Sequence, residues 1–424
     1  MDSEVEFAGV EEPLGGSSLA FAVGFYLSFR WVFTLFFVRV LGTEPRMGPA
    51  ANLVVGLLLL AVASFASLGE PRTWEWKRIA PLRWVLLFLV VSACSFAWTE
   101  SVDLTASFAY WLGMAADVAT VLMLLQGRPV MTAAHSLMKG FIWSSCLLAV
   151  VAWLMPLQED LRLGDYDYFN TNQIGNLCAV SILLAQYLMR RKDGRWTWVV
   201  TFLSVTLLRS LSKTTIAAFL VCECFLLIQD RSVSRRTKAL LTTGVIVAVL
   251  AFWGLFEAYF DIYSSAGNQA ETLTGRLGIW AWIVDAVTEK PWFGHGFDSL
   301  WKVVPPFGPD RFEARHAENE VLQQLYAYGV LGVVMLCGLY GSFYRKIRRL
   351  AQGPVRVALM SLLLFVLVRG LAEAEPFDLL LPLWAIVLFS VLIECMEEGD
   401  EPVGAMAAVE STVAGVRASE ATSS

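Results

Sequence analysis

The sequence predicts an all-α polytopic membrane protein with about twelve transmembrane helices, and three observations support this prediction. Of its 424 residues, 57% are hydrophobic and only 17% are charged. The mean hydropathy of +0.59 is too high for one or two soluble domains. The apolar residues also gather in runs of roughly 20, which is the length of helix that crosses a hydrocarbon core about 30 Å thick.

The expected spans lie one after another with short connections, except for one long interval. They are 18–41, 50–69, 82–98, 106–126, 138–156, 173–189, 196–212, 214–229, 239–257, 322–344, 356–372 and 378–395. Nine spans therefore occupy residues 18–257, and three occupy residues 322–395. Residues 258–321 between them are the extramembrane segment long enough to form structure of its own.

The two ends of the chain, residues 1–17 and 396–424, are acidic and carry much of the net charge of −6. Neither segment has enough apolar side chains to bury on folding, so we expect both to be disordered. The first segment lacks the basic region of a signal peptide, and we expect it to be retained. The charge pattern gives no indication of a nucleic-acid partner.

The loops alternate between basic and neutral or acidic, which predicts an orientation in the membrane. "EPRTWEWKR", "RRKDGR", "DRSVSRRTK" and "RKIRR" are rich in Lys and Arg, whereas "TESVDLT" and "EAEPF" have neither. Because cytoplasmic loops carry the excess of Lys and Arg, both termini should lie in the cytoplasm. The loop 157–172, the turn 209–213 and the interval 258–321 should then lie outside.

The seven cysteines all fall inside apolar runs, which predicts neither a disulfide framework nor a thiol metal site. The three histidines are far apart in the sequence. His135 is expected near the cytoplasmic face, and His295 stands alone between glycines. We therefore expect neither a histidine metal site nor a metal cofactor.

Within the long interval, "TLTGRLGIWAWIVDAVTEKPWFGHGF" predicts one amphipathic helix that ends at Lys290-Pro291 and the following glycines. Its apolar side chains fall on one face, with tryptophans beside it. The face comprises Ile279, Ile283, Ala286 and Val287, and the tryptophans are Trp280, Trp282 and Trp292. Amphipathic helices rich in tryptophan lie at the membrane interface.

Arg276 falls in the first turn of this helix, where the helix dipole disfavours a cation by roughly 0.3–1 kcal/mol. A cation that is kept there suggests a nearby anion. Free backbone N–H groups together with a guanidinium fork would hold a phosphate. A solvated arginine or a contact with lipid headgroups is the alternative that this segment alone leaves open.

The turn "LLRSLSKTTIAAFL" repeats this arrangement, because Arg209 and Lys213 lie between two apolar runs. Ser212 is placed to cap the helix that begins at Lys213. Positive charge on the outer side opposes the orientation rule, and burying it costs about 2.5–3.5 kcal/mol on insertion scales. This cost favours a functional role for both cations, while snorkelling to lipid headgroups is the alternative.

The stretch "FEARHAENEVLQQLYAYG" places Arg315, His316, Glu318, Asn319 and Glu320 at the start of an apolar run. Asn319 is a natural N-cap and Glu320 in the first turn favours the helix dipole, so both have a structural explanation. His316 and Glu318 are not needed for capping. A histidine beside a carboxylate can act as a general base at neutral pH, and an ordinary surface histidine is the alternative.

Other polar residues have weaker indications of function. In "YDYFNTNQIGN", the amides are either helix caps or sugar-binding groups: Asn170, Asn172 and Gln173. Three ionisable residues fall within spans and are expected to pair with each other or with backbone: Arg30, Asp117 and Glu223. Three more close the outer end of a helix, where a structural role is favoured: Arg369, Glu373 and Glu375.

Taken together, these pieces resemble the bacterial O-antigen ligase and O-antigen polymerase superfamily, in particular its exopolysaccharide polymerase branch. "TLTGRLGIWAWIVDAVTEKPWFGHGFDSLW" followed by "HAENEVLQQLYAYGVLG" resembles the core motif of this family. "SFAWTESVDLT", "FNTNQIGN" and "SLSKTTIAAFL" lie where the family has similar short motifs. The resemblance covers residues from about 92 to 395, and its specificity comes from the combination of motifs.

The resemblance implies a GT-C-like O-antigen ligase fold in the bacterial inner membrane, with one large periplasmic loop between helices 9 and 10. Members of the family transfer glycans from an undecaprenyl diphosphate carrier to a hydroxyl group at the periplasmic face, without a metal or other cofactor. The acceptor is another lipid-linked glycan in polymerases and lipid A core in ligases. The resemblance also suggests a flippase and a chain-length regulator as partners.

Matched by motif, Lys213 takes the place of the family's basic residue after the seventh helix, and Arg276 that of the Arg in the loop helix. Together with Arg209, these cations would hold the diphosphate. Arg315, Asn319 and Asn172 would contact or support the glycan.

The catalytic His of the family lies in a His-rich motif that ends in Asn, matched here by His316 and Asn319. This chain departs from the pattern, because family members commonly have His immediately before that Asn and this chain has Glu318. The base is therefore His316, Glu318 or the pair. A carboxylate base requires burial that raises its pKa, or orientation by Arg315.

Three other functions are alternatives to a polymerase. A ligase that joins the glycan to lipid A core is the nearest, and a non-catalytic scaffold for polysaccharide assembly is another. A twelve-helix secondary transporter would usually have related halves and broken helices near the midplane. The sequence has no evident paired halves, and its polar candidates gather on the outer side.

Overall fold

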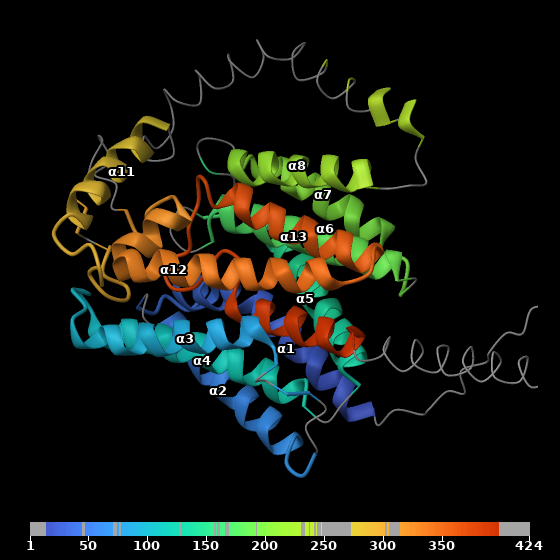
Figure 1. Cartoon of the computed structure of the whole chain (residues 1–424), viewed down its shortest axis with the longest axis horizontal. Helices are drawn as coiled ribbons and strands as arrows, with labels where there is room; N and C mark the ends of the chain where they lie inside the picture. Colours follow the sequence, from blue (N-terminus) through green and yellow to red (C-terminus); the bar gives the residue numbers. More distant parts are fainter. Residues whose placement is uncertain are drawn as a thin grey trace, which may run out of the picture.

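The computed structural model describes residues 14–397 apart from several gaps. The gaps are 45–46, 71–73, 76–77, 127–128, 157, 159–161, 166–168, 192, most of 230–272, 302 and 305–313. Every regular element in the described part is helical, which confirms the all-α prediction. Figure 1 shows most of these helices packed side by side in one bundle.

The first eight helices follow the first eight expected spans. They are α1 (Leu14–Leu35, continued by the π-helical segment Phe36–Val40), α2 (Met47–Ala66), α3 (Ala80–Cys94), α4 (Leu104–Leu124), α5 (Val130–Leu154), α6 (Thr171–Arg190), α7 (Thr197–Ser210) and α8 (Lys213–Gln229). The largest difference is at α5, which begins at Val130 rather than 138. His135 and Lys139 lower the hydropathy there without breaking the helix, because both pair with Asp193.

The remaining helices correspond to the predicted loop helix and to the last three spans. They are α11 (Leu273–Val287), α12 (Glu320–Arg349), α13 (Pro354–Arg369) and a C-terminal helix over 383–397. The C-terminal helix begins later than the predicted 378, because the Asp378 carboxylate accepts the N–H groups of Leu379 and Leu383 ahead of it. The ninth span, 239–257, lies largely outside the described residues, as do 1–13 and 398–424.

Among the described residues, six helices are long and apolar enough to cross a membrane, namely α1 to α5 and α12. Large apolar side chains are exposed on the outside of the bundle, among them Phe65, Leu154 and Trp198. Lipid tails would cover such side chains in a bilayer. The chain is therefore a polytopic membrane protein.

Small residues and an ion pair join helices within the bundle. α1 lies close against α5, and a Cβ atom at Gly24 or Gly140 would come within 2.0 Å of a backbone oxygen of the other helix. Such close approach is common between membrane helices. Arg30 on α1 pairs with Asp117 on α4 at 2.7 Å, as the sequence predicted, whereas Glu223 accepts a hydrogen bond from Gln186.

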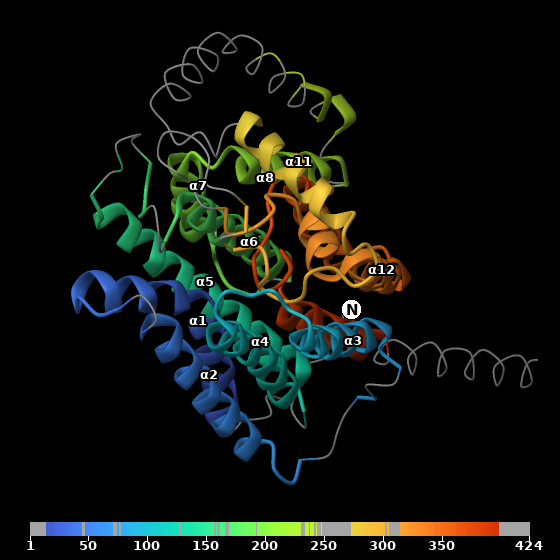
Figure 2. The same cartoon turned by 90° about the vertical axis from the view of Figure 1, so that its left-hand side faces the viewer.

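The loops sort into two ends of the bundle, in agreement with the predicted alternating path of the chain. Contacts at the end that carries α11, here called the α11 end, are Arg39–Asp165, Glu100–His295, Asn172–Ser212 and Asn319–Leu371. Contacts at the opposite end are Trp74–Leu125, His135–Asp193 and Lys346–Glu394. Figures 1 and 2 show α11 beyond the bundle at one end, over the first part of α12.

A break in α12 receives the segment that follows α11. Gly329 has φ 64° and ψ −152°, which interrupts the helical hydrogen bonding. The Val330 N–H instead donates to the Pro291 carbonyl at 2.8 Å, and the His295 N–H donates to the Tyr326 carbonyl at 3.0 Å. The segment 291–297 thus acts as a substitute turn and fixes α11 relative to α12.

Candidate active site

The buried face of α11 fixes the position of Arg276. Ile279 and Ile283 are fully buried, and Ala286 and Val287 pack against the same cluster, which confirms the predicted apolar face. The Trp280 N–H donates to the Ala317 carbonyl at 2.9 Å, so α11 is tied directly to the segment before α12. Arg276 lies one turn before Ile279 and is only 9% exposed.

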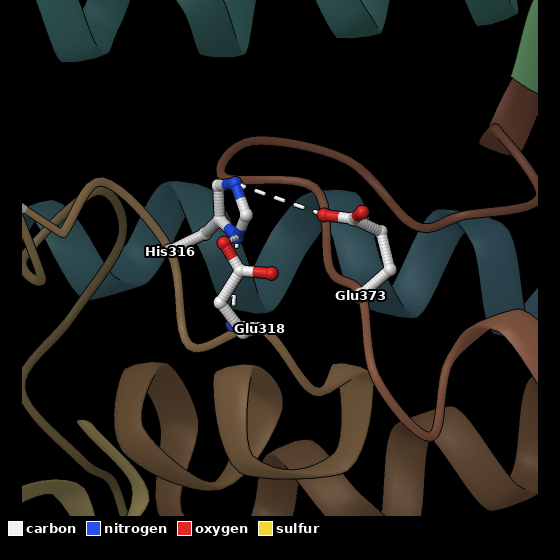
Figure 3. Close-up of side chains that lie close together, drawn as sticks. All are labelled: His316, Glu318 and Glu373. Carbon is white, nitrogen blue, oxygen red and sulfur yellow. Dashed lines mark hydrogen bonds and ion pairs between the residues drawn. The ribbon is translucent and has the colours of Figure 1, made fainter. Parts of the chain in front are cut away.

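Arg276 and the two rival bases lie together. The Arg276 Nη2 is 3.1 Å from the Glu318 Oε2, and the His316 Nδ1 is 3.7 Å from the Glu318 Oε1. Figure 3 shows the Glu318 carboxylate turned toward the imidazole. The structure therefore brings together a predicted phosphate-binding cation and both predicted bases, from segments about forty residues apart in the sequence.

Glu373 is a member of this cluster that sequence reasoning treated as structural. Its Oε1 is 3.9 Å from the His316 Nε2, on the side of the ring away from Glu318 (Figure 3). Arg369, one turn earlier at the end of α13, lies 3.8 Å from the other oxygen of Glu373 and 3.9 Å from Glu375. In the sequence, an arginine and two glutamates follow one another closely at the end of a predicted span. Because buried charges require partners, this grouping could have indicated a charged cluster.

Burial and charge act in opposite directions on the imidazole. Burial lowers the pKa of His316 below its usual value, while the carboxylates of Glu373 and Glu375 oppose the shift. Arg276 and Arg369 act in the same direction as burial. Burial also raises the pKa of Glu375, against the effect of Arg369. His316 is therefore neutral near pH 7 and can accept a proton.

The side chains of His316, Glu318 and Glu373 are close enough to hold a metal ion, with ligand atoms within 4.8 Å of one another. However, two guanidinium groups already lie beside the carboxylates, Arg276 at Glu318 and Arg369 at Glu373. A divalent cation between them would be repelled by both arginines. The donor set therefore fits an acid–base cluster with fixed positive charges better than a metal centre.

The residues that begin α12 have the predicted capping roles and further contacts. The Asn319 side-chain oxygen accepts the Leu322 N–H at 3.0 Å, which confirms Asn319 as the N-cap. Glu320 is buried and accepts hydrogen bonds from the Tyr340 hydroxyl and the Leu380 N–H. Glu320 therefore ties α12 to the loop after α13, in addition to its favourable place at the helix N-terminus.

Arg315 contacts an aromatic ring, whereas the sequence suggested that it could orient a carboxylate base. Its guanidinium lies 6.0 Å from the ring centroid of Trp301, and the residue is exposed. The cation that the structure pairs with Glu318 is Arg276. Orientation of a carboxylate base by Arg315 is therefore replaced by an ion pair with α11.

The turn between α7 and α8 lies at the α11 end, where Ser212 contacts Asn172, and Arg209 and Lys213 flank this turn. Arg209 is half-buried and Lys213 is exposed, and α8 begins at Lys213 as predicted. The contacts described around His316 involve α11, the loop before α12 and the end of α13, and they do not include this turn. The joint diphosphate site of Arg209, Lys213 and Arg276 stays a prediction.

The polar residues around this turn have structural partners. Asn170 and Gln173 form a capping box at the start of α6. The Ser212 hydroxyl, expected to cap α8, donates to the Asn172 side-chain oxygen at 2.7 Å and also contacts the Thr215 hydroxyl. Of the two roles considered for these amides, the structure supports capping for Asn170 and Gln173 and a link between α6 and the turn for Asn172.

His295 does not stand alone, in contrast to the sequence reading. Its Nδ1 lies 2.7 Å from the Glu100 carboxylate, which Lys290 also contacts, and its ring stacks on Tyr326 with centroids 4.5 Å apart. Lys290 and His295 hold the pKa of Glu100 below its usual value. This second charged group fixes the segment 291–297 against the loop after α3.

Comparison with known proteins gives two findings. A family profile described as O-Antigen ligase matches residues 198–337, which include α7, α8, α11 and the first part of α12. A protein of Pseudomonas aeruginosa named O-antigen ligase is 27% identical over 134 residues, which is 32% of this chain and 32% of that protein. The alignment thus spans about a third of the relative's length. The segment that holds Arg276, His316 and Glu318 is therefore similar to the O-antigen ligase family.

Proposed function

We propose that the protein is an inner-membrane glycosyltransferase that polymerises glycan units carried on undecaprenyl diphosphate, in the manner of an exopolysaccharide or O-antigen polymerase. The observation that supports this most strongly is the contact between Arg276 and the His316–Glu318 pair within the family segment. The reaction needs a cation for the leaving diphosphate and a base for the attacking hydroxyl. This cluster supplies both.

Arg276 would stabilise the diphosphate of the donor. Its Nε is buried and has no hydrogen-bond partner among the described residues, so this N–H is available to a ligand. Arg209 and Lys213 add positive charge at the same end of the bundle. Such fixed cations can supply the stabilisation that a metal ion gives in other glycosyltransferases.

His316 would accept the proton from the acceptor hydroxyl. The oxygen then attacks the anomeric carbon, the bond from that carbon to the diphosphate oxygen breaks, and undecaprenyl diphosphate leaves with the electron pair. A single displacement of this kind inverts the anomeric configuration. Glu318 is the weaker candidate for the base, because taking up a proton would cost it the ion pair with Arg276.

A ligase that transfers the finished glycan to lipid A core is the second candidate. The observation in its favour is that both comparisons carry the name O-antigen ligase. Donor and chemistry are the same in the two cases, and the acceptor differs. The active site would face the periplasm in both, and a flippase would supply the donor from the cytoplasmic side.

The deciding experiment is transfer by purified protein supplied with a lipid-linked oligosaccharide, with and without lipid A core. A polymerase is expected to give a ladder of products, and a ligase a single transfer to the core. We expect activity to persist in EDTA, because arginines supply the positive charge. Absence of any transfer under both conditions would exclude both functions.

Arg276→Ala is expected to lower transfer at least 100-fold, because it removes a charge that acts on the leaving group. Arg348→Ala is the matched control, since Arg348 contacts Tyr344 at the opposite end of the bundle. Both variants should insert and purify like the wild type. Full activity of Arg276→Ala would contradict the diphosphate role.

The pH dependence distinguishes the two bases. Because the pKa of His316 lies below its usual value, activity should stay high at neutral pH and fall only as the pH drops through this lowered pKa, where the imidazole becomes protonated. His316→Ala should lose about 10²–10⁴-fold in kcat. Glu318→Gln should lose less kcat and should keep the fall in activity at low pH, which is the acid limb of the pH profile. The opposite ranking of the two variants would make Glu318 the base.

A further inference from the structure

The His316 imidazole lies between two carboxylates, and each of its ring nitrogens faces a different one. Nδ1 faces Glu318 at 3.7 Å and Nε2 faces Glu373 at 3.9 Å. The Glu318 N–H also approaches Nδ1, at 3.4 Å. This contact favours the tautomer with its proton on Nε2, directed toward Glu373 (Figure 3).

Glu373 is buried between His316 and Arg369. Its side chain is only 4% exposed and that of Arg369 is only 2% exposed. One carboxylate oxygen is turned toward His316 and the other toward Arg369. A charge this deeply buried requires a partner, and the Arg369 guanidinium lies beside this carboxylate.

We propose that Glu373, held by Arg369, is a positioning residue that orients His316 and stabilises the imidazolium formed when His316 accepts the proton of the acceptor hydroxyl. The proposal rests on the function proposed above. It assigns no bond making or breaking to Glu373, whose role is electrostatic. The carboxylate supplies a negative charge behind the base, where a buried cation would otherwise be costly.

Other charged side chains lie around the imidazole and can affect the pKa of His316. They come from three elements: Arg276 of α11, Glu318 of the loop before α12, and Arg369, Glu373 and Glu375 at and after the end of α13. Glu375 also pairs with Arg369 and is on the same loop, but its side chain is 22% exposed. It is therefore a matched control for Glu373.

The test compares kcat, KM and the pH profile of the wild type, Glu373→Gln, Glu373→Asp and Glu375→Gln. Glu373→Gln should lower kcat at least tenfold with KM within about threefold, and should move the acid limb to lower pH, because the imidazolium loses its carboxylate. Glu373→Asp keeps the charge and should recover part of both effects. Glu375→Gln should cause a smaller loss than Glu373→Gln.

A second measurement does not depend on activity. The rate of His316 modification by diethyl pyrocarbonate, followed by peptide mass spectrometry across pH, reports the pKa of His316 directly. This pKa should fall in Glu373→Gln. If Glu373→Gln does not fold, Glu373→Asp is expected to show the same shift at smaller size.

The two proposals fail in different ways. An active wild type whose kcat, acid limb and His316 pKa are all unchanged in the Glu373 variants would overturn the role of Glu373 alone. A wild type that transfers no glycan would overturn the proposed function. In that case the His316 pKa of Glu373→Gln still tests the electrostatic coupling between Glu373 and His316. An unchanged pKa would overturn this coupling, and a lowered pKa would support it.

Discussion

At the scale of single residues, Glu318 has a backbone conformation that side chains with a Cβ rarely adopt. Its φ of 50° lies in the left-handed region, which costs about 1–2 kcal/mol for a residue other than glycine. Its neighbours hold this conformation in place. The Ala317 N–H donates to the Gln323 side chain at 2.8 Å, and Asn319 caps α12. The strain thus directs the carboxylate toward Arg276 and His316.

Glu318→Ala and Glu318→Gly test this strain. Both variants remove the carboxylate and its ion pair with Arg276, so they differ only in the backbone preference at position 318. We expect Glu318→Gly to be more stable than Glu318→Ala by about 1 kcal/mol. Thermal unfolding of the protein in detergent measures the difference. Equal stabilities, or a more stable alanine variant, would show that the left-handed conformation carries no cost.

At the scale of elements, two of the four glycines in α12 differ in whether a side chain could replace them. A Cβ at Gly329 would lie 2.5 Å from the Pro291 carbonyl oxygen, and φ is positive there. Gly341 lies in the same helix and has no atom within 4 Å of the corresponding position. The first glycine is therefore needed for the docking of the segment 291–297, and the second is not.

Gly329→Ala should destabilise the protein by at least about 2 kcal/mol, because the backbone is strained and Pro291 must move. Gly341→Ala should be neutral or stabilising by up to about 1 kcal/mol, since alanine is the better helix former. Thermal unfolding and transfer assays of both variants provide the measurement. Because the segment 291–297 fixes α11, Gly329→Ala should also lower transfer. Equal behaviour of the two variants would exclude this role of the break.

The elements also indicate what the sequence could predict. Hydropathy located most of the described helices to within a few residues, because burial in lipid requires continuous apolar runs, and it missed the first two turns of α5. It did not predict the break in α12, since "LYAYGVLG" stays apolar through Gly329. Motif and charge arguments found Arg276, His316 and Glu318. They did not assign Glu373 to the site, because its contact with His316 depends on how α13 packs beside α12.

At the scale of the whole molecule, the candidate chemistry lies at one end of the bundle, and other charged groups lie at the other. His316, Glu318 and Arg276 are at the α11 end, while Lys346 contacts Glu394 and Glu397 at the opposite end. The proposed donor is a lipid whose diphosphate lies at the membrane surface. Which surface the α11 end faces therefore decides whether the proposed function is possible, because the reaction is expected in the periplasm.

Cysteine labelling tests this orientation. Val102, in the loop between α3 and α4, is exposed at the α11 end, and Glu70, after α2, is exposed at the opposite end. Each is replaced singly by cysteine in a chain whose exposed cysteines, Cys94 and Cys337, are changed to alanine. The basic loops predict that Val102→Cys reacts with a membrane-impermeant maleimide in cells with a permeable outer membrane, whereas Glu70→Cys reacts only after the inner membrane is opened. The parent chain without added cysteine controls for background labelling. The reverse pattern would place the His316 cluster in the cytoplasm, where a periplasmic transfer of lipid-linked glycan is impossible.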